Sequence, residues 1–301
     1  MREAFRQALM AHAARPDFIF LTGDLGFQAL EPLRDAMADR FINAGVAEQN
    51  MINVAAGLAQ SGLRPWVYSI APFLYARPFE QIRNDIARPN LPVTLAGNGG
   101  GYGYGVMGST HHALEDYGVL LTLPHLRVFI PAFDSDLSSI VDKLIESTHP
   151  SYLRLGFDEF PGQFQSLEYG CWRKLVAGNR ATILVAGPLV GSIAAEALRL
   201  PASERPSIWL LSELPWVDIP SAFLQDVEAS GHLVVVEEHV KNGGVGQMIS
   251  HSLMVKSVPV RRFTHHYAQG YVSGLHGSQK FHRKESGLDA ASVLTTCSSA
   301  G

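Results

Sequence analysis

The sequence is short of charge. Lys, Arg, Asp and Glu make up 17% of its 301 residues, against about 25% in typical soluble domains. Its 24 Lys and Arg residues stand against 28 Asp and Glu residues, which gives a net charge of −4, and no basic run stands out. A protein that binds nucleic acid through an electrostatic surface is therefore excluded. The small charged fraction also indicates that another subunit covers part of the surface.

Cysteines and long apolar runs are scarce as well. Cys171 and Cys297 lie far apart and form no CxxC pair, which excludes the spacing of a zinc or redox site and favours a reducing, cytoplasmic compartment. No stretch approaches the ~20 apolar residues of a membrane span, and the N-terminus lacks the apolar core of a signal peptide. The best apolar run, residues 182–198, is interrupted by Pro188 and Glu196. We therefore expect no membrane partner.

What the sequence does contain is an alternation of short β-branched runs with longer helical patterns, which predicts an α/β fold with parallel sheets. Strands are expected at residues 17–22, 64–69, 91–96, 126–130, 152–155, 182–187, 207–211, 233–236 and 258–262. Helices are expected near residues 47–62, 73–88 and 134–148. The chain length predicts about two domains, and the turn-rich stretch 156–171 interrupts the pattern. We therefore place the domains at residues 1–165 and 166–301.

Three loops carry the residues that suggest a site, because sites in open parallel sheets form beyond the carboxyl ends of the strands. These loops are residues 22–27 (TGDLGF), 45–50 (GVAEQN) and 97–112 (GNGGGYGYGVMGSTHH). Glycines at the density of the third loop permit positive φ angles and close approach of the backbone to a ligand. This loop ends in His111 and His112, of which we expect one in the site and one as a structural partner. No carboxylate or cysteine stands at ligand spacing, so no metal site is predicted.

Glu48 lies where the second loop enters a helix. The helix dipole alone favours a carboxylate in a first turn. However, this helix is apolar on most sides and is expected to be buried, and a buried carboxylate needs a partner or a raised pKa.

Phe73 and Phe79 follow on a strand-to-helix connection. They are either core residues or an aromatic platform for a planar heterocycle.

Two long segments, residues 41–87 (FINAGVAEQN…NDIA) and 108–132 (GSTHHALEDYG…FIPA), closely resemble the pyrimidine-binding domain of transketolases. They are also similar to 1-deoxyxylulose-5-phosphate synthase and to the beta subunits of 2-oxoacid dehydrogenases. Residues 234–249 (VVVEEHVKNGGVGQMI) resemble the C-terminal domain of the same superfamily. The resemblance covers about residues 3–290 and implies two three-layer α/β/α domains with mainly parallel sheets.

The resemblance implies chemistry with thiamin diphosphate. Glu48 matches the family's catalytic glutamate, which hydrogen-bonds N1′ of the aminopyrimidine and so promotes removal of the C2 proton. Phe73 matches the aromatic residue that stacks on the aminopyrimidine, and Phe79 is the second candidate. Asp24 matches an acidic position near the cofactor and the subunit interface. The pair Thr110-His111 matches a Thr-His element whose histidine contacts the sugar and its intermediate.

Four further residues are implied in the substrate site. His112 adjoins the Thr-His element, and Arg154 resembles an arginine that contacts a substrate phosphate. Two positions depart from the family pattern: Met107 stands where an aspartate contacts a sugar hydroxyl, and Asn98 stands near a missing histidine. We therefore expect a deoxy, modified or nucleotide-linked sugar, or another nonstandard carbonyl compound, in place of an ordinary pentose phosphate.

The family's diphosphate-binding domain, which precedes this region in single-chain members, is expected on a separate chain. Its GDG…N motif is imitated by Gly23-Asp24-Leu25 and Asn50, but Leu25 stands in place of the second glycine. The resemblance therefore implies a split transketolase that transfers a two-carbon ketol unit. Its N-terminal partner subunit would hold the diphosphate and Mg²⁺ or Ca²⁺ in an α2β2 assembly. The alternatives are the beta subunit of a 2-oxoacid dehydrogenase, a deoxyxylulose-synthase-like enzyme, and a non-catalytic regulatory subunit.

Overall fold

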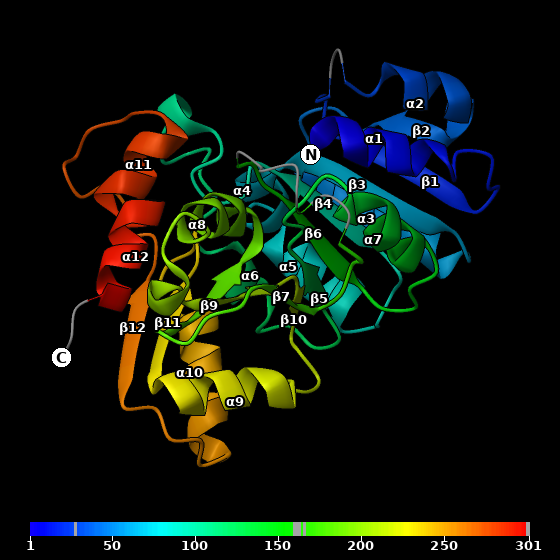
Figure 1. Cartoon of the computed structure of the whole chain (residues 1–301). Helices are drawn as coiled ribbons and strands as arrows, with labels where there is room; N and C mark the ends of the chain where they lie inside the picture. The colour runs from blue at the N-terminus through cyan, green and yellow to red at the C-terminus, as the bar shows by residue number, and fades with distance from the viewer. Residues whose placement is uncertain (27–28, 159–163, 165–166, 299–301) are drawn as a thin grey trace.

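The described part of the chain forms two β-sheets with helices on both faces, as Figure 1 shows for the computed structural model. The structure describes residues 1–26, 29–158, 164 and 167–298. The domain boundary predicted at residue 165 lies outside the described residues.

The first sheet has seven strands in the order β10-β5-β6-β4-β3-β1-β2. All of its neighbouring strands are parallel except β10, which comes from the second half of the chain and runs antiparallel to β5. The strands are β1 (Phe18–Thr22), β2 (Phe41–Asn43), β3 (Arg64–Ile70), β4 (Thr94–Asn98), β5 (Arg127–Phe129), β6 (Ser151–Leu155) and β10 (Glu213–Leu214).

The second sheet has five strands in the order β12-β11-β8-β9-β7, and only β7 is antiparallel to its neighbour. Its strands are β7 (Trp172–Val176), β8 (Thr182–Ala186), β9 (Ser207–Leu211), β11 (His232–Val236) and β12 (Arg262–His266).

The helices connect these strands. In the first half they are α1 (Arg2–Met10), α2 (Glu31–Met37), η1 (Ala38–Arg40), α3 (Glu48–Gln60), α4 (Ala71–Tyr75), α5 (Phe79–Gln81), η2 (Ile82–Ala87), η3 (Gly105–Met107), α6 (Asp116–Leu120) and α7 (Asp136–Ile145). In the second half they are η5 (Gly187–Leu189), α8 (Val190–Ala197), η6 (Ala202–Glu204), α9 (Ser221–Ser230), α10 (Val245–Val255), α11 (Gln279–Glu285) and α12 (Ala290–Ser298).

Among the described residues, three clusters of buried apolar side chains hold these layers together. One packs α1, α2 and α7 against the first sheet, and another packs α8 and α12 against the second sheet. The third cluster contains residues of α3, α9, α10 and both sheets, so the two halves of the chain share a core. Each sheet is therefore covered on both faces, which confirms the expected α/β fold.

Most strands expected from the sequence are present, because a fully buried strand appears as a short apolar run. The strand expected at 258–262 is wrong in position, since β12 begins only at Arg262. Pro259 cannot donate a ladder hydrogen bond, and Val258 and Val260 pack against the core before the chain enters the sheet. The helix expected near 73–88 is interrupted at Pro78 and continues as α5 and η2.

The ends of the parallel strands bring the three predicted loops together. In the sheet register Thr22 pairs with Tyr68, Ile70 pairs with Asn98, and Asn98 pairs with Leu155. Thr22 also pairs with Asn43 of the parallel strand β2. The loops after β1, β2 and β4, which are the three predicted loops, therefore leave the same edge of the first sheet.

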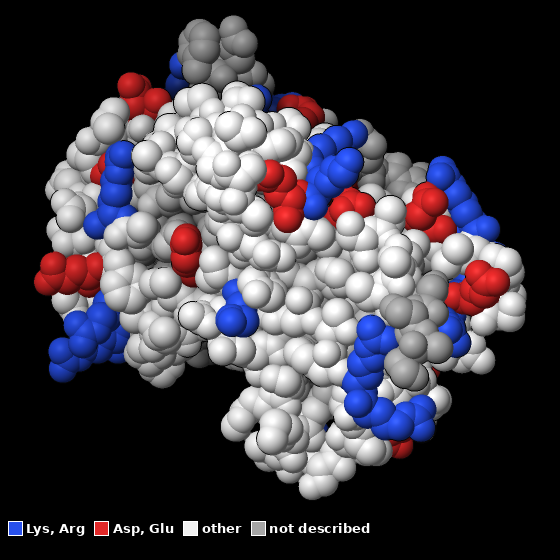
Figure 2. Space-filling model, turned by 90° about the vertical axis from the view of Figure 1, so that its left-hand side faces the viewer, with Lys and Arg blue, Asp and Glu red and all other residues white. Residues whose placement is uncertain are grey.

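The surface carries little charge. Figure 2 shows one face of the molecule, on which charged side chains of both signs lie singly or in small groups between broad uncharged areas. Across the described part of the chain, none of the helices combines the length and the apolar character that a membrane crossing requires.

Candidate active site

Glu48 is the first residue of α3, and only 5% of it is exposed. The preceding turn contains Gly45 at a φ of 70°, which glycine adopts without strain. The positive end of the helix dipole favours a negative charge at this position. Nη1 of Arg77 donates to Oε1 of Glu48 at 2.7 Å. The carboxylate is therefore buried at the edge of the sheet and has a charged partner.

Phe73 lies in α4, which follows β3, and it is half-buried. The guanidinium carbon of Arg77 lies over the Phe73 ring, 3.9 Å from its centroid. The ring of His111 meets Phe73 at 5.1 Å between centroids and at an interplanar angle of 67°. The structure thus joins Glu48 and Phe73 through the Arg77 side chain and places His111 against Phe73, although the three residues lie on different segments.

Phe79 has different surroundings. It begins α5 and packs against the apolar cluster that contains α3 and η2. Both rings are half-buried, but Phe79 packs against the core, whereas Phe73 lies under a planar cation. The geometry therefore favours Phe73 as the platform for a planar ligand.

The glycine-rich loop positions His111. Asn98, at the end of β4, donates through Nδ2 to the Tyr104 hydroxyl at 2.8 Å, and the Tyr104 ring lies 5.8 Å from that of His111. Gly99 has a φ of 80°, and a Cβ there would lie 2.2 Å from the Tyr104 ring, so only glycine allows this packing. Nδ1 of His111 lies 2.9 Å from the Thr110 hydroxyl.

His112 points away from His111 into the protein and is 3% exposed. Its Nδ1 lies 2.8 Å from the Tyr271 hydroxyl, and its Nε2 lies 2.8 Å from the Gly105 carbonyl oxygen. Burial lowers the pKa of His112, which favours the neutral ring. Both ring nitrogens hold the loop in place, so a direct substrate contact by His112 stays a prediction that would require breaking one of these bonds.

Met107 lies on the surface of this loop. It ends the short helix η3 and is 55% exposed. An exposed thioether offers a ligand an apolar contact and neither donates nor accepts a hydrogen bond well.

Asp24 has a φ of 57°, unusual for a residue other than glycine. Its backbone N–H donates to Oδ1 of Asn43, and Nδ2 of Asn43 donates to Oδ1 of Asp24, both at 3.0 Å. Gly23 packs close to Glu48, because a Cβ there would lie 3.9 Å from Cγ of Glu48. The Asp24 turn therefore borders the start of α3.

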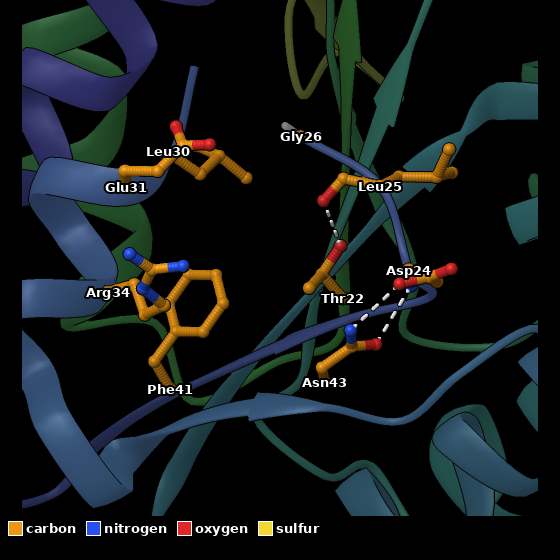
Figure 3. A pocket seen from close by; sticks show the side chains of 9 residues that line it. All are labelled: Thr22, Asp24, Leu25, Gly26, Leu30, Glu31, Arg34, Phe41 and Asn43. Carbon is orange, nitrogen blue, oxygen red and sulfur yellow. Dashed lines mark hydrogen bonds between the residues drawn. The ribbon is translucent and has the colours of Figure 1, made fainter. Parts of the chain in front are cut away.

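A cavity of about 210 Å³ borders the Asp24 turn. Figure 3 shows Glu31 and Arg34 of α2 on one side of this cavity, with Asp24 and Asn43 on the other.

Arg154 lies on β6 and is 3% exposed. Its Nε donates to Oδ2 of Asp116 at 2.7 Å, and its Nη2 donates to the carbonyl oxygens of Ala113 and Glu238 at 2.9 and 2.8 Å. The guanidinium thus joins three segments inside the protein. A contact with a substrate phosphate stays a prediction, and it would require Arg154 to leave Asp116.

The two glutamates of the EEHVKNGG segment are structural. Glu237 accepts the backbone N–H groups of Val245 and Gly246 at the start of α10, at 2.7 and 2.9 Å. Glu238 accepts the backbone N–H of Tyr102 at 2.7 Å and pairs with Arg283. The second half of the chain therefore holds the glycine-rich loop of the first half.

Sequence reasoning missed Arg77 and Tyr104. Arg77 looked like an ordinary charged residue of a predicted helix, and a partner in Glu48 became visible only in the structure. For Tyr104 the available signal was the presence of an aromatic side chain inside a glycine-rich loop.

Among the described residues, no group of three or more His, Cys, Asp or Glu side chains could hold a metal ion.

Comparisons with known proteins give consistent results. Residues 1–161 match the pyrimidine-binding domain of transketolase. The chain is 30% identical over 267 residues to an apulose-4-phosphate transketolase subunit of Phocaeicola vulgatus, and the match covers 86% of this chain and 85% of that protein. The protein of the same name from Actinobacillus succinogenes is 30% identical over 276 residues, covering 88% and 86%. The 1-deoxy-D-xylulose-5-phosphate synthase of Myxococcus xanthus is 31% identical over 297 residues; the match covers 96% of this chain but only 49% of that enzyme.

Two solved structures are similar as well. A structure described as a split-gene transketolase, inactive beta4 tetramer, matches with a TM-score of 0.83 and 28% identity, and the match covers 98% of this chain and 96% of that one. The transketolase from Leishmania mexicana matches with a TM-score of 0.74 and 21% identity, covering 98% of this chain and 44% of that one; this second likeness concerns the fold.

Proposed function

Because this chain belongs to the transketolase family, we propose that it is the beta subunit of a split, thiamin-diphosphate-dependent transketolase that transfers a two-carbon ketol unit between sugar-derived carbonyl compounds. The observation that carries the proposal is the grouping of buried Glu48 with Phe73 and His111 at one edge of the first sheet. The other functions expected from the sequence are not favoured, since the relatives matched over most of both chains are transketolase subunits.

The residues present fit the aminopyrimidine end of thiamin diphosphate. Glu48 offers a buried carboxylate oxygen and Phe73 a half-buried aromatic ring, and both side chains contact the Arg77 guanidinium. When bound, the cofactor supplies the carbon nucleophile of the transfer. In this proposal Glu48 holds a proton at a pyrimidine nitrogen and Phe73 fixes the plane of the ring. His111, whose Nδ1 lies next to the Thr110 hydroxyl, has Nε2 left to contact a substrate oxygen.

The remaining cofactor contacts would come from a second chain. We propose that an N-terminal transketolase subunit holds the diphosphate together with Mg²⁺ or Ca²⁺, and that the two chains form an α2β2 tetramer. Two observations support a partner: relatives of matching length are named as single subunits of a transketolase, and a similar structure is described as an inactive tetramer of beta chains.

Cys171 and Cys297 are free thiols, which supports a cytoplasmic location.

The test is reconstitution with that partner. Calorimetry should show tight, magnesium-dependent binding of thiamin diphosphate to the complex and weak or no binding to this chain alone. The complex, but neither chain alone, should transfer a two-carbon unit from a ketose phosphate to an aldose phosphate. Tight binding to this chain alone would contradict the division of the site between two chains.

The proposal for the substrate rests on the loop that carries Met107. We propose that the exposed Met107 favours a sugar lacking the hydroxyl that an acidic residue would otherwise bind. A competition assay with the complex should therefore favour deoxy or modified sugars, with apulose 4-phosphate included because two relatives are named for it. A clear preference for xylulose 5-phosphate and ribose 5-phosphate would contradict this proposal and would point to another residue as the hydroxyl contact.

A further inference from the structure

We infer that the Arg77 side chain competes with thiamin diphosphate for the cofactor site. Without the cofactor, its guanidinium fills the space that the aminopyrimidine would take, and it leaves this space when thiamin diphosphate binds. The inference deepens the proposed function and rests on it. It concerns a residue to which neither the family resemblance nor the comparisons assign a role.

The contacts of Arg77 are those that a bound aminopyrimidine would need. Its guanidinium is planar and carries N–H donors. It stacks over the Phe73 ring at 3.9 Å and donates to Oε1 of Glu48 at 2.7 Å. A flat, nitrogen-bearing ring on the same platform, bonded to the same carboxylate, would occupy the same space. The two groups therefore exclude one another.

Arg77 is held in a way that permits its release. Its side chain is 46% exposed, whereas that of Glu48 is buried, so water can solvate the guanidinium once it has left the carboxylate. Its backbone is fixed separately, because its carbonyl oxygen accepts from Nε2 of Gln49 at 3.4 Å. A cavity of about 370 Å³ lies beside it, lined by residues 46–50 and Arg77. The side chain can therefore move while the backbone of the site stays in place.

The pairing of Arg77 with Glu48 stabilises the protein when no cofactor is bound. Glu48 is 5% exposed, and a buried carboxylate without a partner is strongly destabilising. Arg77 provides that partner until the cofactor arrives. The consequence is competition: the apparent dissociation constant of the cofactor is the intrinsic value divided by the fraction of molecules in which Arg77 has left.

The test measures cofactor affinity in the complex with the N-terminal subunit and Mg²⁺. Arg77→Met keeps an unbranched apolar side chain and removes the guanidinium, so it should bind thiamin diphosphate about tenfold more tightly than the wild type by calorimetry. The matched control is Arg83→Met, an exposed arginine on η2, which should leave the dissociation constant unchanged. Unchanged or weaker binding by Arg77→Met, in a complex whose wild type binds the cofactor, would overturn the inference.

A second measurement needs no cofactor. In this chain alone, denaturant unfolding of Arg77→Met, Glu48→Gln and the double variant should show that the two losses are not additive, because the side chains interact directly. Additive losses would overturn the inference even if affinity changed. Failure of the wild-type complex to bind thiamin diphosphate would instead contradict the proposed function, and the two failures are therefore distinguishable.

Discussion

At the scale of single residues, the proposed chemistry depends most on the buried carboxylate of Glu48. Glu48→Gln keeps the size and burial of the side chain but cannot take part in proton transfer. In the reconstituted complex we expect exchange of the cofactor C2 proton to fall about 10²–10⁴-fold, measured by proton NMR in deuterated buffer. Glu80→Gln, on the exposed side of α5, is the matched control. An unchanged exchange rate in Glu48→Gln would remove Glu48 from the mechanism.

Substitutions of Phe73 and Phe79 should have different effects on cofactor binding and on protein stability. Phe79 packs against the core, so Phe79→Ala is expected to lower the free energy of unfolding by about 2–4 kcal/mol. Phe73→Ala should cost less stability and should weaken thiamin diphosphate binding more. Calorimetry of the complexes and denaturant unfolding of both variants provide the comparison. If Phe79→Ala has the larger effect on affinity, Phe79 is the platform.

At the scale of elements, Arg154 links β6, the start of α6 and the segment after β11. Arg154→Met leaves Asp116, which is fully buried, without its charged partner. The free energy of unfolding should fall by about 3–5 kcal/mol, measured in denaturant, and Asp116→Asn in the same chain should restore part of it. Arg88→Met, at an exposed position, is the control. Unchanged stability combined with a raised KM for a phosphorylated substrate would support the phosphate contact instead.

At the scale of the whole molecule, several buried histidines make stability depend on pH. Burial lowers the pKa of His112, His239 and His282 below the value in an unfolded chain. The unfolded chain therefore binds more protons below about pH 6.5. Stability is complete above that pH and is lost as the pH falls toward the folded-state pKa values, by at most about 1.4 kcal/mol per pH unit for each histidine.

Unfolding of the wild-type chain in denaturant between pH 7.5 and 5 checks this dependence. His112→Asn should reduce the slope of unfolding free energy against pH. His251→Asn, at an exposed position of α10, should leave the slope as it is. A wild-type chain that becomes more stable toward pH 5 would contradict the prediction.

The sequence by itself determined the fold and the family. The central strands are fully buried, and such strands appear as apolar runs between turn residues. The burial of Glu48 followed from the apolar helix around it, and the loops of the site followed from the carboxyl ends of parallel strands. These features depend on neighbours along the chain.

Only the tertiary structure decided which polar side chains lie in the candidate site and which hold other segments of the protein in place. The parallel pairing of β2 and β3 on either side of β1, together with the path of the chain through Pro78, brings Arg77 onto Glu48 and Phe73. His112 and His111 are neighbours in the sequence, yet one is buried against Tyr271 and the other faces Phe73. Arg154 is occupied by Asp116 and by carbonyl groups from both halves of the chain. Such pairings depend on segments far apart in the sequence, because a buried polar group takes whichever partner the packing brings within hydrogen-bond distance.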